Sequence, residues 1–378
     1  MDAGLWNSPV GRPLDGEGAS GRLTIDLAAI CRNYGKLAAM LAPAKTGAVV
    51  KADAYGLGAG RVGSALLAAG CRDFFVAHFG EAMKLKPHLR DAGRIFVLNG
   101  LQPGSEAACA QAGIGPVLNS IEQLRRWRSA ARNCGRVLPA VLQFDTGMSR
   151  LGIPPEERPL LRRELEGCGE IEILCVMSHL ACADDADSRQ NADQLAEMRK
   201  IAAEFPGFDV CFANSGGIFL GAEYHHVLAR PGIALYGGAP SGGGANPMEP
   251  VVRLDVAVIQ TRTVAAGIPV GYGGTHVTSG ETRLATIAAG YADGLLRSLS
   301  SRGAVYYDGI RLPVVGRVSM DSMTVDITAL PPGTLSLGSL VEVVGPHQTL
   351  EDLAEAAGTI AYEILTGLGH RYQREYHH

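Results

Sequence analysis

Lys51 and Tyr55 form the first pair of side chains whose types and spacing indicate chemistry. Lys51 follows the apolar residues 48–50 and precedes a glycine-containing turn, so a lone amine ends a buried strand. Burial disfavours the ammonium form and lowers a lysine pKa, which leaves the neutral amine that attacks carbonyl groups. Tyr55 lies four residues later, so on a helix its phenol would share a face with the amine. We therefore expect a Schiff-base lysine here, and the alternative is a surface lysine beside a packed tyrosine.

Apolar runs similar to the one before Lys51 recur through the first two thirds of the sequence. Helix-like stretches rich in Ala, Leu, Glu and Arg separate them, and examples are residues 64–69, 105–111, 121–131 and 187–204. Strands that alternate with helices form parallel sheets, so eight such units predict an α/β fold, a TIM-type (β/α)8 barrel. The eight runs are residues 47–51, 73–79, 95–100, 115–119, 137–144, 173–179, 208–214 and 226–232.

Polar side chains end most of these runs, and a barrel brings such side chains together. The carboxyl ends of the strands converge on one mouth, where the active sites of barrels are built. A single buried polar residue is often a satisfied core group, whereas several at one mouth favour a functional site. The residues at these positions are Lys51, Asn99, Asn119, Asp145, His179, Asn214, Ser215 and Arg230.

The pattern changes near residue 245, in the glycine-rich stretch 241–247. Alternating strands with Gly and Pro turns follow, which predicts an all-β C-terminal domain with a short helix or two at residues 349–365. We therefore expect a flexible leader at 1–20, a barrel at 21–245 and a β-domain at 246–378. Residues 23–27, in which apolar and polar side chains alternate, are a candidate extra strand of the β-domain.

Composition excludes several classes of function. The 378 residues are 47% hydrophobic with a net charge of -4, so no basic surface for nucleic acid is indicated. The sequence has no apolar run long enough to span a bilayer and no signal peptide, which predicts a cytoplasmic protein. The eight cysteines and ten histidines follow no disulfide or metal-binding spacing, so we expect no metal site.

Eight short segments, in order, resemble the motifs of the bacterial alanine racemase family. Members of that family are pyridoxal-phosphate enzymes with a barrel followed by a β-domain, and the resemblance covers residues 21 to 376. The segments are residues 48–58, 145–152, 177–181, 213–215, 230–237, 270–273, 290–294 and 316–321.

The resemblance implies a cofactor site. Lys51 would hold pyridoxal 5'-phosphate as a Schiff base, and His179 would lie beside the ring and support Arg230, which faces the pyridine nitrogen. Arginine keeps its proton near neutral pH, so the ring nitrogen stays unprotonated and is a poorer electron sink. That favours racemisation over transamination. The implied phosphate ligands are Tyr55, Ser215, the backbone of Gly232 and Ile233, and Tyr362.

The resemblance also implies two bases and a dimer. Racemisation removes a proton from one face of Cα and returns one to the other, so a base is needed on each face. Lys51 and Tyr272 would be these bases, with Tyr272 supplied by the partner subunit of a homodimer. Arg150 and the backbone of Met320 would hold the substrate carboxylate, while Tyr291 and Tyr362 would line a narrow opening. The implied activity interconverts L-alanine and D-alanine and supplies D-alanine for peptidoglycan.

Two positions depart from the family pattern, and several alternatives stay open. Gln143 stands where many members have a carbamylated lysine, and Cys211 stands where some have a histidine. A racemase of broader specificity is one alternative, and a basic-amino-acid decarboxylase of the same architecture is another. The decarboxylase is disfavoured because its glutamate would stand at the position of Arg230. The others are a non-catalytic cofactor carrier, which needs no Tyr272, and a phosphate-handling barrel that uses no aldehyde.

Overall fold

The computed structural model describes residue 14 and residues 18–378, so most of the predicted leader at 1–20 lies outside the described residues. Within these, the chain forms two compact units. One is Ile30–Glu249, and the other combines Pro250–His378 with the N-terminal residues up to Ala29. Among the described residues, no helix combines the length and the apolar character that crossing a membrane requires.

The Ile30–Glu249 unit is a parallel barrel, which confirms the predicted fold. Its sheet runs in the order β2-β10-β9-β8-β7-β6-β5-β4-β3, and only Gly47 separates β2 from β3 in the chain. The sheet therefore closes on one interrupted strand, because Gly47 and Val49 donate their N–H groups to Ala229 and Pro231 at 2.9 Å. The strands are β2 (Lys45–Thr46), β3 (Ala48–Val49), β4 (Asp73–Val76), β5 (Arg94–Val97), β6 (Gly115–Leu118), β7 (Leu138–Gln143), β8 (Ile171–Met177), β9 (Val210–Cys211) and β10 (Leu228–Ala229).

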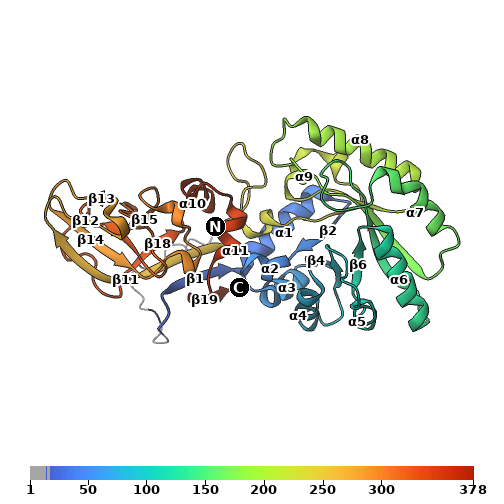
Figure 1. The fold of residues 1–378 in the computed structure, drawn as a ribbon, viewed down its shortest axis with the longest axis horizontal. Coiled ribbons are helices and arrows are strands. Elements are labelled where there is room, and N and C mark those ends of the chain that lie inside the picture. The colour runs from blue at the N-terminus through green and yellow to red at the C-terminus, as the bar shows by residue number, and fades with distance from the viewer. Residues whose placement is uncertain (1–13, 15–17) are drawn as a thin grey trace. The chain divides into compact units, whose positions relative to one another are not determined.

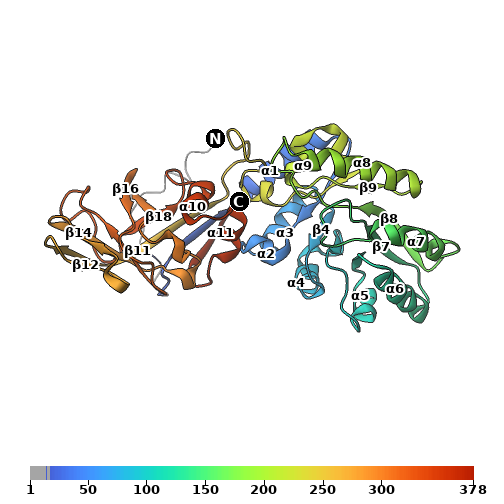
Figure 2. The same cartoon turned by 45° about the horizontal axis from the view of Figure 1, so that its top comes forward.

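Helices surround these strands (Figures 1 and 2). Helix α6 shows why they do so: its apolar residues, Trp127 among them, recur at helical spacing and are buried. Ser120 accepts a hydrogen bond from the N–H of Gln123 at its start, and Gly135 ends it in a left-handed conformation. The helices are α1 (Leu27–Leu41), α2 (Lys51–Tyr55), α3 (Ala59–Ala68), α4 (Phe79–Leu89), α5 (Glu106–Ala112), α6 (Ile121–Cys134), α7 (Arg158–Leu165), α8 (Arg189–Glu204) and α9 (Ser215–Leu220).

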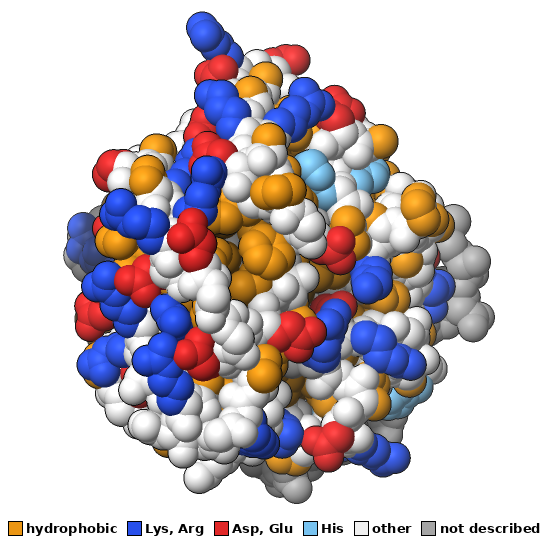
Figure 3. All heavy atoms as spheres, turned by 90° about the vertical axis from the view of Figure 1, so that its right-hand side faces the viewer, with side chains coloured by type: hydrophobic (Ala, Val, Ile, Leu, Met, Phe, Trp, Pro, Cys, Tyr) orange, Lys and Arg blue, Asp and Glu red, His pale blue; other side chains and the backbone are white. Residues whose placement is uncertain are grey.

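One face of the barrel unit gathers hydrophobic side chains at its centre and surrounds them with charged side chains of both signs (Figure 3). Short 3-10 helices complete this unit at Pro155–Glu157, Ala222–Tyr224 and Ile233–Tyr236.

The second unit is built on antiparallel strands, as predicted for the C-terminal region. Strand β1 (Gly21–Asp26) pairs with β11 and with β19 of this unit, and Leu23 and Ile25 are fully buried. The predicted barrel range of 21–245 therefore includes a strand that the structure places in the β-rich unit, because its apolar side chains pack there. The other strands are β11 (Val252–Val264), β12 (Pro269–Val270), β13 (His276–Val277), β14 (Thr282–Ile287), β15 (Ala304–Tyr307), β16 (Ile310–Pro313), β17 (Met323–Asp326), β18 (Leu340–Val344) and β19 (Gln373–His377).

Two helices and three short 3-10 segments join these strands. The helices α10 (Leu350–Ala357) and α11 (Ala361–Gly367) fall in the region predicted to be helical. Thr349 begins α10 with a capping box, in which its hydroxyl and the carboxylate of Asp352 satisfy each other's backbone N–H groups. The 3-10 segments are Tyr272–Gly274, Tyr291–Asp293 and Arg297–Leu299.

Candidate active site

Lys51 begins an unusual turn directly after the first barrel strand. The four residues Ala52, Asp53, Ala54 and Tyr55 all have positive φ angles, between 52 and 56°. Left-handed backbone costs about 1–2 kcal/mol per non-glycine residue, so surrounding contacts must hold it. The carboxylate of Glu81 does so by accepting the N–H of Ala52 at 2.7 Å. The amine and the phenol are thus related by a left-handed turn, which differs from the right-handed helix considered from the sequence.

The surroundings of Lys51 favour the neutral amine. Burial lowers the pKa of Lys51, and the positive charge of Arg150 lowers it further, while Glu81 opposes the change. A neutral amine at the end of a strand is the nucleophile that a Schiff base requires. The half-buried position of Lys51 leaves the nitrogen within reach of a ligand.

Tyr55, Ser215 and Gly232 lie together and form a small polar cradle. The Ser215 hydroxyl accepts the N–H groups of Gly232 at 2.9 Å and Ala234 at 3.3 Å. A Cβ atom at Gly232 would lie 2.3 Å from the Tyr55 hydroxyl, so only glycine permits this approach. The Tyr55 ring stacks on Tyr236 with the ring centroids 4.5 Å apart. Hydroxyls and backbone N–H groups suit a phosphate, so this cradle fits the phosphate of pyridoxal phosphate.

Arg230 and His179 form a second cluster inside the same mouth. Arg230 is only 3% exposed, and its Nη2 atom donates to the carbonyl of Ser178 at 2.7 Å. The same nitrogen lies 3.5 Å from Nδ1 of His179. Burial lowers the pKa of His179 to about 3, and the charges of Arg230, Arg150 and Lys51 add to this effect. The imidazole is therefore neutral at physiological pH. It does not repel the arginine, and its Nδ1 atom can accept a hydrogen bond from the guanidinium.

The loop after β7 presents Arg150. Asp145 accepts the N–H groups of Gly147, Met148 and Ser149 at 2.8 to 3.1 Å, which folds a tight turn. Arg150 follows this turn and is exposed, although its charge acts on both Lys51 and His179. The ends of separate strands therefore converge at one mouth, as the barrel pattern indicated.

Some polar residues at strand ends have structural contacts instead. The Asn119 amide donates to the carbonyls of Leu98 and Val117 at 3.0 and 3.1 Å. Asn214 caps α9 by accepting the N–H of Gly217 at 2.9 Å. Gln143 is buried at the end of β7. In the described residues, no group of three or more His, Cys, Asp or Glu side chains could hold a metal ion.

Tyr272 and Tyr291 line a pocket in the β-rich unit. The cavity has a volume of about 310 Å³, and Arg297, Arg317, Val318 and Ser319 complete its lining. Tyr272 stands in a turn between β12 and β13 and is 71% exposed. Sequence reasoning did not single out the two arginines, although Arg317 lies in the segment 316–321 that carried the resemblance.

An ion pair between the buried Asp293 and the half-exposed Arg371 fixes the loops that carry Tyr291 and Met320. The N–H of Tyr291 bonds to Ser319, and that of Ala292 bonds to Met320, both at 3.0 Å. Asp293, which is 1% exposed, pairs with Nε and Nη2 of Arg371 at 2.7 and 2.9 Å. Arg371 also bonds Asp321 at 2.7 Å, so one guanidinium joins both loops.

Tyr362 lies on the helix that packs against the same loops. A Cβ at Gly294, in the turn after Tyr291, would lie 2.3 Å from the carbonyl of Gly367 at the end of α11. Tyr362 itself is 41% exposed. The structure thus places Tyr272, Tyr291, Met320 and Tyr362 in the β-rich unit, and Lys51, Tyr55, Arg150, His179, Ser215, Arg230, Gly232 and Ile233 in the barrel.

A parallel barrel with a lysine-centred mouth and a separate β-rich unit defines a two-domain class of barrel protein. Within that class, the family model "Alanine racemase, N-terminal domain" matches residues 25–240, and "Alanine racemase, C-terminal domain" matches residues 251–376. The chain therefore belongs to the alanine racemase family.

Individual relatives agree with this assignment. A protein of Rhizobium johnstonii described as "Alanine racemase, catabolic" is 67% identical over 376 residues, which is 100% of each chain. A second of that description, from Agrobacterium fabrum, is 64% identical over 95% of this chain and 92% of its own. The crystal structure of the alanine racemase from Bartonella henselae with covalently bound pyridoxal phosphate is 45% identical. It covers 95% of this chain and 100% of its own with a TM-score of 0.91.

Proposed function

We propose that this protein interconverts L-alanine and D-alanine with pyridoxal 5'-phosphate bound covalently to Lys51. The observation that carries the proposal is the position of Lys51: a lysine of lowered pKa ends a barrel strand at the mouth that also holds the phosphate-type cradle and Arg230. A family relative at 45% identity binds the same cofactor covalently.

The cradle would hold the phosphate group. The hydroxyls of Tyr55 and Ser215 and the backbone N–H of Ile233 are donors suited to a dianion, and the N–H of Gly232, which here bonds to the Ser215 hydroxyl, would complete the set. Gly232 is essential to this arrangement, because the Tyr55 hydroxyl occupies the space that a side chain would need. Tyr362 is the further phosphate ligand that the family resemblance implies.

Pyridoxal phosphate, when bound, supplies an electron sink that makes the hydrogen on the amino acid Cα acidic. Arg230 would limit that sink, because a guanidinium keeps its own proton and would leave a ring nitrogen beside it unprotonated. The neutral His179 and the carbonyl of Ser178 hold the guanidinium in place. A weaker sink favours rapid return of a proton to Cα, and thus racemisation.

Two bases would then move the protons. Lys51 would act on one face of Cα and Tyr272 on the other, while Arg150 and the backbone of Met320 hold the substrate carboxylate. Tyr272 is 71% exposed in the protomer. A base that works in a water-free site must be shielded from solvent, so another surface has to cover it. We therefore propose a homodimer in which each subunit gives its Tyr272 to the site of the other, behind an opening lined by Tyr291 and Tyr362.

A racemisation assay tests the proposal. Purified protein is incubated with L-alanine, L-serine, L-lysine and L-arginine, and the products are separated by chiral chromatography. We expect the highest rate with L-alanine. A preference for lysine or arginine would instead support the racemase of broader specificity, and loss of carbon dioxide would support the decarboxylase. Borohydride treatment followed by mass spectrometry should find the cofactor on the Lys51 peptide, and no adduct there would refute the proposal.

The metabolic direction is a separate proposal. The sequence suggested a supply of D-alanine for peptidoglycan, whereas the relatives at 67 and 64% identity are described as catabolic. We propose that the protein can serve a cell in either direction, because racemisation of alanine is reversible. Expression in a D-alanine-requiring bacterium tests the supply role, since growth without added D-alanine is expected. The eight free cysteines agree with a reducing, cytoplasmic location, which cell fractionation tests.

A further inference from the structure

Arg230 is a buried cation without a carboxylate partner among the described residues. Its Nη1 atom donates to the carbonyl of Cys211 at 2.9 Å and to the sulfur of the same residue at 3.0 Å. Its Nη2 atom donates to the carbonyl of Ser178 and faces His179. A buried charge is costly unless an opposite charge or strong hydrogen bonds accompany it. The sulfur of Cys211 is the one side-chain atom in this set that can become an anion.

The surroundings of Cys211 stabilise such an anion. Cys211 is fully buried on β9, and the thiol of Cys175 on β8 donates a hydrogen bond to it. Burial alone would raise the pKa of Cys211, but the Cys175 thiol and the Arg230 guanidinium outweigh it and lower the pKa to about 7. The pKa of Cys175 is raised, first by its hydrogen bond to Cys211 and then by burial. One of the two thiols therefore keeps its proton while the other gives it up.

Besides Arg230, Asp73 acts on Cys211, and Lys45, Arg94 and Asp209 line a cavity beside Cys175. Asp73 on β4 opposes ionisation of Cys211, but Arg94 neutralises it through an ion pair of 2.6 Å. His179 is uncharged near neutral pH. The charge that faces Cys211 most directly is thus that of Arg230.

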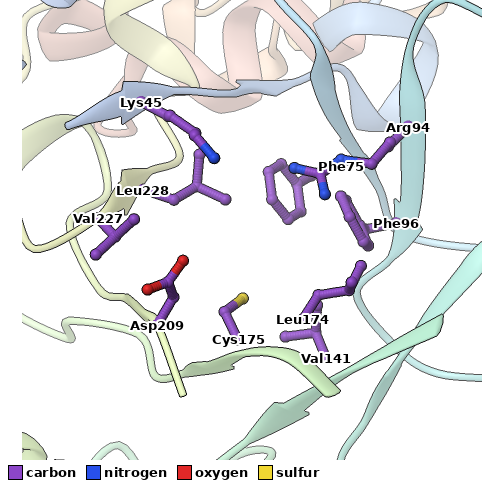
Figure 4. Close-up of a pocket in the computed structure, with 10 residues that line it drawn as sticks. All are labelled: Lys45, Phe75, Arg94, Phe96, Val141, Leu174, Cys175, Asp209, Val227 and Leu228. Carbon is purple, nitrogen blue, oxygen red and sulfur yellow. The ribbon is translucent and has the colours of Figure 1, made fainter. Parts of the chain in front are cut away.

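A cavity lies beside Cys175. It has a volume of about 60 Å³, and Cys175 lines it together with Lys45, Arg94 and Asp209 (Figure 4). The sulfur of Cys175 points into the cavity. Lys45 and Arg94 are the first residues of β2 and β5, so the cavity lies at the amino ends of the strands, opposite Lys51. Its volume suffices for water, which can accept the proton that the thiol pair releases.

We propose that Cys211 is a positioning residue that holds Arg230 through a thiolate–guanidinium pair, with Cys175 as the hydrogen-bond donor that completes it. The proposal rests on the proposed role of Arg230 at the cofactor ring. As the pH rises through the transition, the Cys211 S–H bond breaks, the proton leaves to water and the sulfur becomes a stronger acceptor for Nη1. Arg230 is then held more firmly, so turnover should increase over the same pH range.

The first experiment measures the thiolate directly in the holoenzyme. The ultraviolet absorbance of thiolate is followed as a function of pH, and the curve of Cys211→Ser is subtracted from that of the unmodified protein. We expect a thiolate that forms with a midpoint near pH 7. The matched control is Cys109→Ser, which removes another fully buried thiol, on α5, and should leave this transition in place. A midpoint at or above that of a free cysteine, about 8.5, would overturn the proposal.

The second experiment removes the partners of the sulfur. Arg230→Gln should raise the midpoint of the Cys211 transition by about 1–3 pH units, because an adjacent opposite charge shifts a pKa by that amount. Cys175→Ala should raise it as well, and it serves as the test if Arg230→Gln does not fold. A midpoint that neither change moves would contradict the pair.

The third experiment separates this proposal from the proposed function. The pH profile of kcat for alanine racemisation should rise near pH 7 in the unmodified protein and in Cys109→Ser, and the rise should be absent in Cys211→Ser. An unchanged profile in Cys211→Ser would refute the positioning role while leaving the racemase intact. A protein that racemises no alanine would refute the function, yet its thiolate titration would still report on the pair.

Discussion

The barrel mouth and the loops of the β-rich unit present their side chains in opposite ways. Ser215 and Arg230 are each 3% exposed and Tyr55 is 4% exposed, and neighbouring groups fix all three. In contrast, Tyr272 is 71% exposed and Met320 is 53% exposed. Most of the groups proposed to hold the cofactor are therefore already fixed within the barrel, whereas Tyr272 and Met320 of the β-rich unit are open to solvent in the protomer. Changes in the barrel should thus affect cofactor binding, whereas a change at Tyr272 should affect turnover alone.

Lys51→Ala tests the barrel side of this comparison and should have the largest effect. Without the amine, covalent attachment of the cofactor is lost, and one of the two bases is lost with it. We expect no cofactor on the peptide after borohydride reduction and no measurable racemisation. Lys45→Ala is the matched control, because it removes a lysine of the same interrupted strand at the opposite end of the barrel. Covalent cofactor in Lys51→Ala would show that another lysine carries it.

Tyr272→Phe tests the β-rich side. The change removes only a hydroxyl from an exposed ring, so the fold and the covalent cofactor should persist. Turnover should decrease about 10²–10⁴-fold, the usual contribution of a general acid–base group. The measurements are the visible absorbance of the bound cofactor and the racemisation rate. Tyr307→Phe, on strand β15 of the same unit, is the control. Normal turnover in Tyr272→Phe would remove this tyrosine from the mechanism.

Gly232→Ala tests whether the cradle of Tyr55, Ser215 and Gly232 binds the phosphate of the cofactor. The added methyl group would lie 2.3 Å from the Tyr55 hydroxyl, so the phenol or the turn must move. Overpacking of this kind costs about 1–3 kcal/mol, and we expect that loss in cofactor affinity and in stability. Fluorescence titration with pyridoxal phosphate and thermal unfolding measure the two.

Gly35→Ala is the control for the cradle variant. Gly35 lies in α1 with no atom near the place of a Cβ, so alanine should leave cofactor affinity unchanged and should stabilise the helix slightly. Equal cofactor affinity in Gly232→Ala and in the unmodified protein would mean that the phosphate lies elsewhere.

Much of the barrel could be predicted from local pattern. All eight predicted apolar runs overlap a strand, and α6 begins at Ile121 as expected. Hydrophobic periodicity carries this information because it depends only on neighbours in sequence. The left-handed turn after Lys51 was not predicted, since contacts such as that of Glu81 impose it against local preference.

The interactions that sequence reasoning missed join distant residues. Arg371 bonds to both Asp293 and Asp321, and the local sequence around these residues does not predict either ion pair. Cys175 and Cys211 fit no disulfide or metal-binding spacing, yet adjacent strands bring the two thiols together. Such contacts depend on the register between strands. The register is set by the packing of the whole fold, so it cannot be read from short segments of the sequence.

The smallest expected effect is the pH dependence of stability that His179 causes. It tests whether the barrel mouth excludes a proton from this imidazole. Its pKa is lowered to about 3 by burial and by the nearby Arg230, Arg150 and Lys51. Between about pH 6.5 and pH 3 the unfolded chain therefore binds a proton at this residue that the folded chain does not. The free energy of unfolding should decrease as the pH falls through this range, by at most about 1.4 kcal/mol per pH unit. Urea unfolding of the cofactor-free protein at pH 7.5 and 5.5 measures the loss, which should be smaller in His179→Gln. Identical losses in both proteins would mean that the barrel mouth does not exclude the proton from this imidazole.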